Sequence, residues 1–247
     1  MNALIRAELL KLGSTRTTRL LVLGGLAIAA LVGTATATTA GGEVSAALGS
    51  AASIANIVGV SAMPGFFMLI LGVLAMAGEY QHRTITQTFL SVPVRGRVVA
   101  AKLAAIATAG VVTATAMMTT ALLAALPHLW AAGGSIHLVN AQVGRTALGT
   151  LLAGALFGIA GTSLGALLRS QIAAVVAVAA WVAIGEAVLG LILGPDVARW
   201  LPGGAASALA ASGTHALPQW AAALVLTGYC AAGLAAATRL TLRRDVT

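Results

Sequence analysis

The chain has 247 residues, of which 59% are hydrophobic and only 8% are charged, and its mean hydropathy is +0.98. Soluble domains carry about 25% charged residues, so this composition excludes an ordinary water-soluble fold and indicates a protein that lies mostly in a bilayer. The net charge of +8 does not indicate nucleic-acid binding, because the basic residues cluster between apolar runs, as they do in membrane proteins. The single cysteine, Cys230, excludes an internal disulfide.

Residues 2–12 (NALIRAELLKL) predict a short amphipathic helix on the membrane surface. Glu8 falls inside the apolar arc of this helix, so the amphipathic pattern is imperfect. A plain charged tail is the alternative interpretation. The apolar side chains on one side are Leu4, Ile5, Leu9 and Leu12, flanked by Arg6 and Lys11.

Six apolar segments are long enough to cross a membrane, because a transmembrane helix needs about 20 apolar residues. Helices are the expected structure, since backbone polar groups in lipid must be satisfied within the chain. We therefore predict an all-α membrane protein with a single transmembrane domain over residues 1–247. The expected spans are residues 20–40, 54–78, 103–126, 146–168, 172–194 and 218–238.

The distribution of Lys and Arg predicts the orientation of these spans. With the N-terminus inside, twelve of the fourteen basic residues fall on the inner side, and only Arg145 and Arg199 fall outside. Both termini are therefore expected to be cytoplasmic. A cleaved signal peptide ending at Ala35-Thr36-Ala37 is the alternative for the first span, although the apolar run continues to span length. The inner residues are Arg6, Lys11, Arg16, Arg19, Arg83, Arg95, Arg97, Lys102, Arg169, Arg239, Arg243 and Arg244.

The polar stretch 78–102 joins the second and third spans on the predicted inner side. Thr84 and Gln87 fit a capping box and predict a short helix that runs through Ser91. Pro93 would end this helix. The alternative is a loop on the lipid headgroups. In either case three apolar side chains, Ile85, Phe89 and Leu90, are exposed to a partner or to lipid.

The sequence contains no phosphate-binding P-loop of the form G-x-x-x-x-G-K-[ST]. Residues 161–165 (GTSLG) match G-x-S-x-G, but no histidine lies within a predicted span to serve as a base for the serine. We interpret this segment as a helix-packing surface, in which glycines allow a neighbouring helix to approach closely. The glycines of this surface are Gly149, Gly154, Gly158, Gly161 and Gly165.

Few polar side chains lie within the predicted spans. Glu186 is the one acidic residue deep in a span, and it is either a site for a proton or cation or a structural group with polar partners. Three threonines of the third span share helical spacing and either line a path or bond the carbonyls of their own helix. Pro64 is expected to kink the second span. The three threonines are Thr108, Thr115 and Thr119.

The arrangement resembles the permease subunits of ABC-2 type ABC transporters, the six-helix family of bacterial exporters. The resemblance rests on the run AELLKLGSTR at residues 7–16 and on the residues around the polar stretch. Arg83 stands where many relatives have glycine, which is a modest departure. The residues around the stretch are Glu79, Arg83, Thr84, Pro93-Val94-Arg95 and Lys102.

The resemblance implies that the polar stretch is a coupling helix, which docks on a separate ATPase subunit through Glu79, Arg83, Thr84, Ile85, Phe89 and Leu90. It implies two copies of that ATPase with their ATP and Mg, and pairing of this chain with itself or with a similar permease. The expected activity is export of a lipophilic or amphipathic compound (a drug, lipid or peptide) across a bacterial cytoplasmic membrane. No cofactor or metal in this chain, no catalytic residue and no nucleic acid are expected.

Two other classes of function remain open on the sequence. One is an ion-coupled secondary transporter that uses Glu186, and the other is a membrane scaffold whose cytoplasmic loop binds another protein. A neighbouring gene for a P-loop ATPase would favour the exporter over both.

Overall fold

The computed structural model describes residues 1–40, 50–60, 65–81, 95–131, 139–211 and 216–243, and every regular element in these ranges is a helix. The all-helical prediction is thereby confirmed for the described part of the chain. The helices are α1 (Asn2–Ser14), α2 (Arg16–Ala40), α3 (Ala51–Val60), α4 (Gly65–Gln81), α6 (Arg95–Ala131), α7 (Ala141–Leu168), α8 (Gln171–Ala180), the π-helical turn η2 (Trp181–Gly185), α9 (Glu186–Leu193), α10 (Pro195–Ala198), α11 (Pro202–Leu209) and α12 (Gln219–Arg243).

Six helical segments are long and apolar enough to cross a membrane, which confirms the number of expected spans. The second of them runs through residues 61–64, so the kink expected at Pro64 lies outside the described residues. The third is longer than expected, because α6 begins at Arg95 and continues to Ala131. The six segments are Arg16–Thr38, Ala51–Gln81, Gly96–Ala131, Ala141–Leu168, Gln171–Leu193 and Gln219–Arg239.

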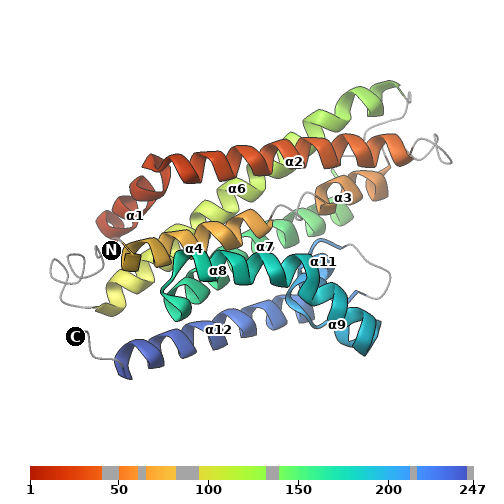
Figure 1. The fold of residues 1–247 in the computed structure, drawn as a ribbon. Helices are drawn as coiled ribbons and strands as arrows, with labels where there is room; N and C mark the ends of the chain where they lie inside the picture. Colours follow the sequence, from red (N-terminus) through yellow and green to blue (C-terminus); the bar gives the residue numbers. More distant parts are fainter. Residues whose placement is uncertain (41–49, 61–64, 82–94, 132–138, 212–215, 244–247) are drawn as a thin grey trace.

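Helix α7 lies in the interior of the bundle, between α4, α6 and α12 (Figure 1). Its glycines explain how the backbones come so close. A Cβ atom at Gly161 would collide with the backbone oxygen of Leu69 in α4, and one at Gly165 would lie 2.7 Å from the oxygen of Val73. On the α6 side, a Cβ atom at Gly154 would lie 2.9 Å from the oxygen of Gly110. Small residues at such crossings allow van der Waals contact between backbones, which drives helix association in lipid.

The long helices run between two ends of the molecule, and α1 and the last turn of α12 lie at the same end (Figure 1). We call this the terminal end. The second end holds the short helices α10 and α11, which the sequence analysis treated as part of an outer segment. Gly194, with φ of +82°, ends α9 there, a conformation that glycine adopts readily because it has no Cβ. Proline begins both short helices, a position where its missing N–H removes no helical bond.

Candidate functional site: a charge cluster at the terminal end

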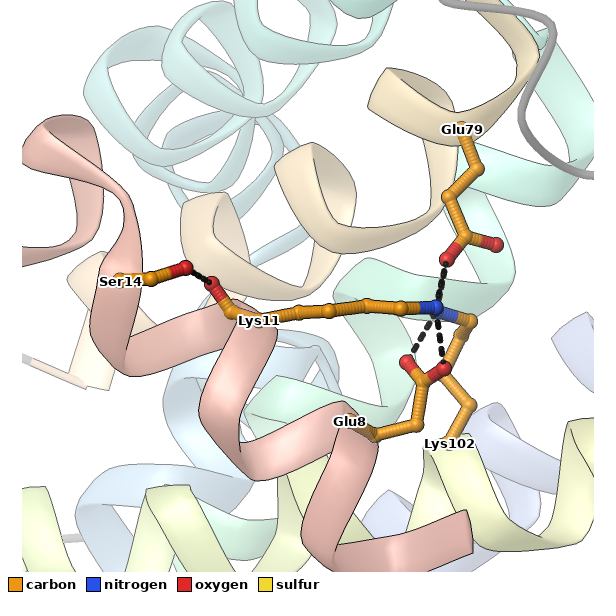
Figure 2. Close-up of polar contacts among 5 residues, drawn as sticks. All are labelled: Glu8, Lys11, Ser14, Glu79 and Lys102. Atoms are coloured by element: carbon orange, nitrogen blue, oxygen red, sulfur yellow. Dashed lines mark hydrogen bonds and ion pairs between the residues drawn. The ribbon is translucent and has the colours of Figure 1, made fainter.

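Four charged side chains from three helices meet at the terminal end (Figure 2). Glu8 and Lys11 come from α1, Glu79 from the last turn of α4, and Lys102 from the third turn of α6. Glu8 and Lys11 lie three residues apart, so they project from neighbouring positions on one face of α1. Glu8 lies within the apolar arc predicted for residues 2–12 because that face of α1 packs on the bundle, where Glu8 is buried.

Both lysines bridge the two carboxylates. The Nζ of Lys102 donates to Glu8 Oε2 at 2.6 Å and to Glu79 Oε1 at 2.8 Å. The Nζ of Lys11 donates to Glu8 Oε1 at 2.7 Å and to Glu79 Oε1 at 3.2 Å. Two positive and two negative groups therefore form a closed, neutral network that joins α1, α4 and α6.

Burial separates the two lysines. The side chain of Lys102 is 7% exposed and that of Lys11 is 50% exposed, while both glutamates lie near the buried end of this range. A buried charge is tolerated only when it is paired and hydrogen-bonded. Lys102 is thus the inner cation, on which both carboxylates depend, and Lys11 closes the network toward solvent.

The network shifts the pKa values of the two residues on α1. Burial by itself raises the pKa of Glu8, but the hydrogen bonds from Lys102 and Lys11 and their charges outweigh it and hold this pKa below the ordinary 4.5. Burial lowers the pKa of Lys11, yet the bond from Glu8 and the charges of both glutamates raise it above the ordinary 10.5. Both shifts favour the charged forms, so Glu8 and Lys11 are both ionised at neutral pH.

The cluster fixes the bases of the two helices that flank the polar stretch. Glu79 lies just before residues 82–94 and Lys102 lies just after them. Arg83, Thr84, Ile85, Phe89 and Leu90, which the family resemblance assigns to ATPase coupling, lie outside the described residues. Glu79 is the member of that predicted set whose contacts the structure gives.

Glu186 is the first residue of α9 and directly follows the π-helical turn η2. Helix α9 lies at the opposite end of the bundle from α1 (Figure 1). The carboxylate of Glu186 accepts hydrogen bonds from the Trp181 indole nitrogen at 2.9 Å and from the backbone N–H of Gly203 at 2.8 Å. Gly203 is in the first turn of α11, where the backbone N–H groups lack helical partners and the helix dipole favours an anion. These hydrogen bonds join η2 to the start of α11.

The three threonines predicted either to line a path or to bond within their own helix all make hydrogen bonds within α6. Thr108 and Thr115 are exposed, and their hydroxyls donate to the carbonyls of Ala104 and Val111 at 2.8 Å. Thr119 makes the same kind of bond within α6. The Ser163 hydroxyl likewise donates to the carbonyl of Ile159 in its own helix at 3.1 Å, inside the glycine-rich face of α7. Such bonds within one helix are the common arrangement for hydroxyl side chains in lipid.

All four members of the cluster stand out in the sequence, but their pairing does not. Glu79 and Lys102 belong to the two ends of the polar stretch in the sequence, whereas the structure places Lys102 in a buried turn of α6. Two signals pointed to the pairing: an acid within the apolar arc of α1 and a lysine at the start of an apolar helix.

A comparison of the chain with protein-family models gave no match, and a comparison with curated proteins gave none either.

Proposed function

We propose that this protein is the permease subunit of an ATP-driven exporter of the ABC-2 type, which moves a lipophilic or amphipathic compound out of a bacterial cell. In this proposal ATP is hydrolysed by a separate ATPase subunit, because the chain has no P-loop. The orientation with both termini in the cytoplasm, and pairing with a second permease chain, belong to the proposal.

The observation that carries the proposal is the charge cluster. Its four members are drawn from the two parts of the sequence on which the family resemblance rests, the run at residues 7–16 and the residues around the polar stretch. These parts lie far apart in the chain, yet Lys102 bonds to both Glu8 and Glu79. Each part contributes one glutamate and one lysine to the network. In this proposal the two parts share one mechanical task, which is to move together when the ATPase acts on them.

The cluster suggests how the energy of ATP would reach the membrane. A push on residues 82–94 from an ATPase would act at once on α4 and α6, the two helices that enter and leave this segment. Because Lys102 ties both helices to α1, the three would move together as one body. The glycine crossings would pass the movement from α4 to α7, since close-packed interiors transmit displacement rather than absorb it.

The test is co-purification with an ATPase. The chain is co-expressed in turn with P-loop ATPases encoded in its own genome, and complexes are isolated through a tag on the ATPase. Phe89→Asp places a charge where burial against the partner is expected, so it should abolish co-purification while membrane insertion is kept. Substrate-stimulated ATP hydrolysis should be lost with it.

Gly13→Asp serves as the matched control, because it adds the same charge at the terminal end, at an exposed position with no atom within 4 Å of an added Cβ. This variant should retain the ATPase. Full recovery of the ATPase with Phe89→Asp would contradict the proposed coupling helix. Failure of the wild-type chain to bind any ATPase would contradict the proposed function as a whole.

The ion-coupled transporter remains the second class of function, and Glu186→Gln tests it. The exporter predicts that this variant still transports when ATP is supplied, because an amide oxygen can still accept hydrogen bonds from Trp181 and Gly203. Complete loss of transport with intact assembly would favour the ion-coupled class.

A further inference from the structure

An apolar cavity of about 360 Å³ lies beside α7, and α4, α8, η2, α11 and α12 contribute to its walls. It is a groove that is partly open along one side. Six of its lining residues follow one face of α7 and set its length. They are Leu156, Phe157, Ala160, Ser163, Leu164 and Leu168.

The cavity lies where two packed clusters of side chains meet. Phe157 and Ala160 of α7 contact the cluster formed with α12 and also the cluster formed with α4 and α8. Both α8 and α12 pack on α7, and the groove is the space left between them. Ala177 of α8 and Tyr229 of α12 line it and remain exposed, so they mark its open side.

The length and the volume of the groove limit the kind of molecule that fits in it. From Leu156 to Leu168 the α7 face rises about 18 Å, at 1.5 Å per residue. This is close to the thickness of one leaflet, about half of a hydrocarbon core of roughly 30 Å. A volume of about 360 Å³ spread over that length is too narrow for a second helix, which is about 10–12 Å across. It is nevertheless more than twice the roughly 150 Å³ that holds one benzene molecule in a protein core.

The two ends of the groove differ in polarity. Leu168 ends α7 at the terminal end of the molecule, and Arg169 follows it directly, with its guanidinium 5.3 Å from the centre of the Tyr80 ring. A positive charge therefore follows directly on Leu168, the last residue of α7 that lines the groove. The other end lies near Leu156, which is midway along α7.

We propose that this groove binds one acyl chain of a phospholipid from the leaflet on the side of the termini. The chain end would reach the level of Leu156, and the lipid phosphate would lie beside Arg169. The proposal concerns this chain alone and does not depend on the ATPase. A bound acyl chain would fill the space between α8 and α12 and so hold both helices on α7.

The test uses the full chain in vesicles of phosphatidylethanolamine and phosphatidylglycerol. A small fraction of the phosphatidylglycerol carries a diazirine at the end of one acyl chain, and adducts formed on irradiation are mapped by peptide mass spectrometry. Adducts on the cavity peptides of α7 and α12 should saturate at a low fraction of probe. Adducts on the exposed face of α2, which includes Leu23 and Leu31, should rise in proportion to the probe. A proportional rise at both places would overturn the proposal.

Two variants locate the site. Ala177→Phe projects a ring into the open side of the groove and should reduce the saturable adducts at least five-fold. Ala173→Phe is the matched control, because it adds the same ring to an exposed position on α8 that does not line the groove; its adducts should match those of wild type. Equal labelling of the two variants would overturn the assigned site. Saturable labelling by a diazirine fatty acid, without labelling by the phospholipid, would overturn the assigned lipid class.

Discussion

At the scale of single residues, the cluster at the terminal end shows how burial decides which of two similar groups matters. Lys11 and Lys102 contact the same two carboxylates at comparable distances. They differ in exposure, and an exposed ion pair contributes little because water and ions screen it. A buried cation that is removed leaves its carboxylates unpaired in a medium that solvates them poorly.

Lys102→Met should therefore destabilise the protein by about 3–5 kcal/mol, the usual cost of breaking a buried ion pair. Lys11→Met should cost about 0–1 kcal/mol, as for a surface pair. Unfolding in mixed detergent micelles, followed by helix content, measures both. Equal losses for the two variants would mean that the inner lysine has no special role.

Acid should weaken the same cluster. Because the pKa of Glu8 is lowered in the folded protein, its ionised form stabilises the fold above the ordinary value of 4.5, and this contribution is lost as the pH falls through the lower folded value. The stability difference between wild type and Glu8→Gln should thus shrink as the pH falls below the ordinary value of 4.5. A difference that stays constant over this range would contradict the assignment. The raised pKa of Lys11 acts at the alkaline end, where its contribution is lost only as the pH rises above 10.5.

At the scale of helices, the central position of α7 depends on its glycines, which have no side chain to hold the neighbouring helices away. Its glycines face the backbones of α4 and α6, and each of these contacts would be lost if a methyl group forced the helices apart. The small residues thus do in lipid what apolar side chains do in a water-soluble core, where the hydrophobic effect brings helices together.

Gly161→Ala should lower the free energy of unfolding by about 1–3 kcal/mol, the range for overpacking. The new methyl group would collide with the backbone of Leu69, which cannot move aside as a flexible side chain can. Gly228→Ala is the control. It lies in α12, with no atom within 4 Å of the added Cβ, and should stabilise by about 0.5–1 kcal/mol through helix propensity. Thermal unfolding of the two variants in one detergent compares them. A stable Gly161→Ala protein would show that α4 and α7 can separate without loss.

At the scale of the whole molecule, basic residues lie mostly at one end of the bundle. The terminal end carries α1 and the starts of α2 and α6, with Arg6, Arg16, Arg19 and Arg97, whereas Arg145 and Arg199 belong to the other end. This asymmetry orients a membrane protein during insertion, because basic segments are retained in the cytoplasm.

Cysteine labelling in intact cells tests the proposed orientation, in which both termini lie in the cytoplasm. In a Cys230→Ala background, which has no other cysteine, an impermeant maleimide should label Asp196→Cys from outside. Gly13→Cys should react only after the cells are opened. Both native residues are exposed, so access to the reagent depends on the side of the membrane and not on burial. The reverse pattern would place both termini outside.

The helical class, the six spans and most of the positions where the spans end follow from local features of the sequence. These features depend on local quantities: the length of an apolar run, the cost of unbonded backbone in lipid and the spacing of glycines. The sequence also singled out Glu8, Glu79 and Lys102, because charges stand out in an apolar chain. The short helices α10 and α11 escaped it, since a four-residue and an eight-residue helix leave too few turns for a periodic pattern to be read.

Which charges pair, and which side chains leave space between them, follows from the packing of the folded bundle. Lys102 is 94 residues from Glu8, and no local rule brings α1 against the start of α6. The partners of Glu186 depend on packing in the same way, because Gly203, which donates to it, lies in a separate helix. The groove beside α7 likewise follows from how two neighbouring helices diverge. Pairing and empty space are properties of the packed bundle, where interactions between distant segments outweigh the local preferences of each one.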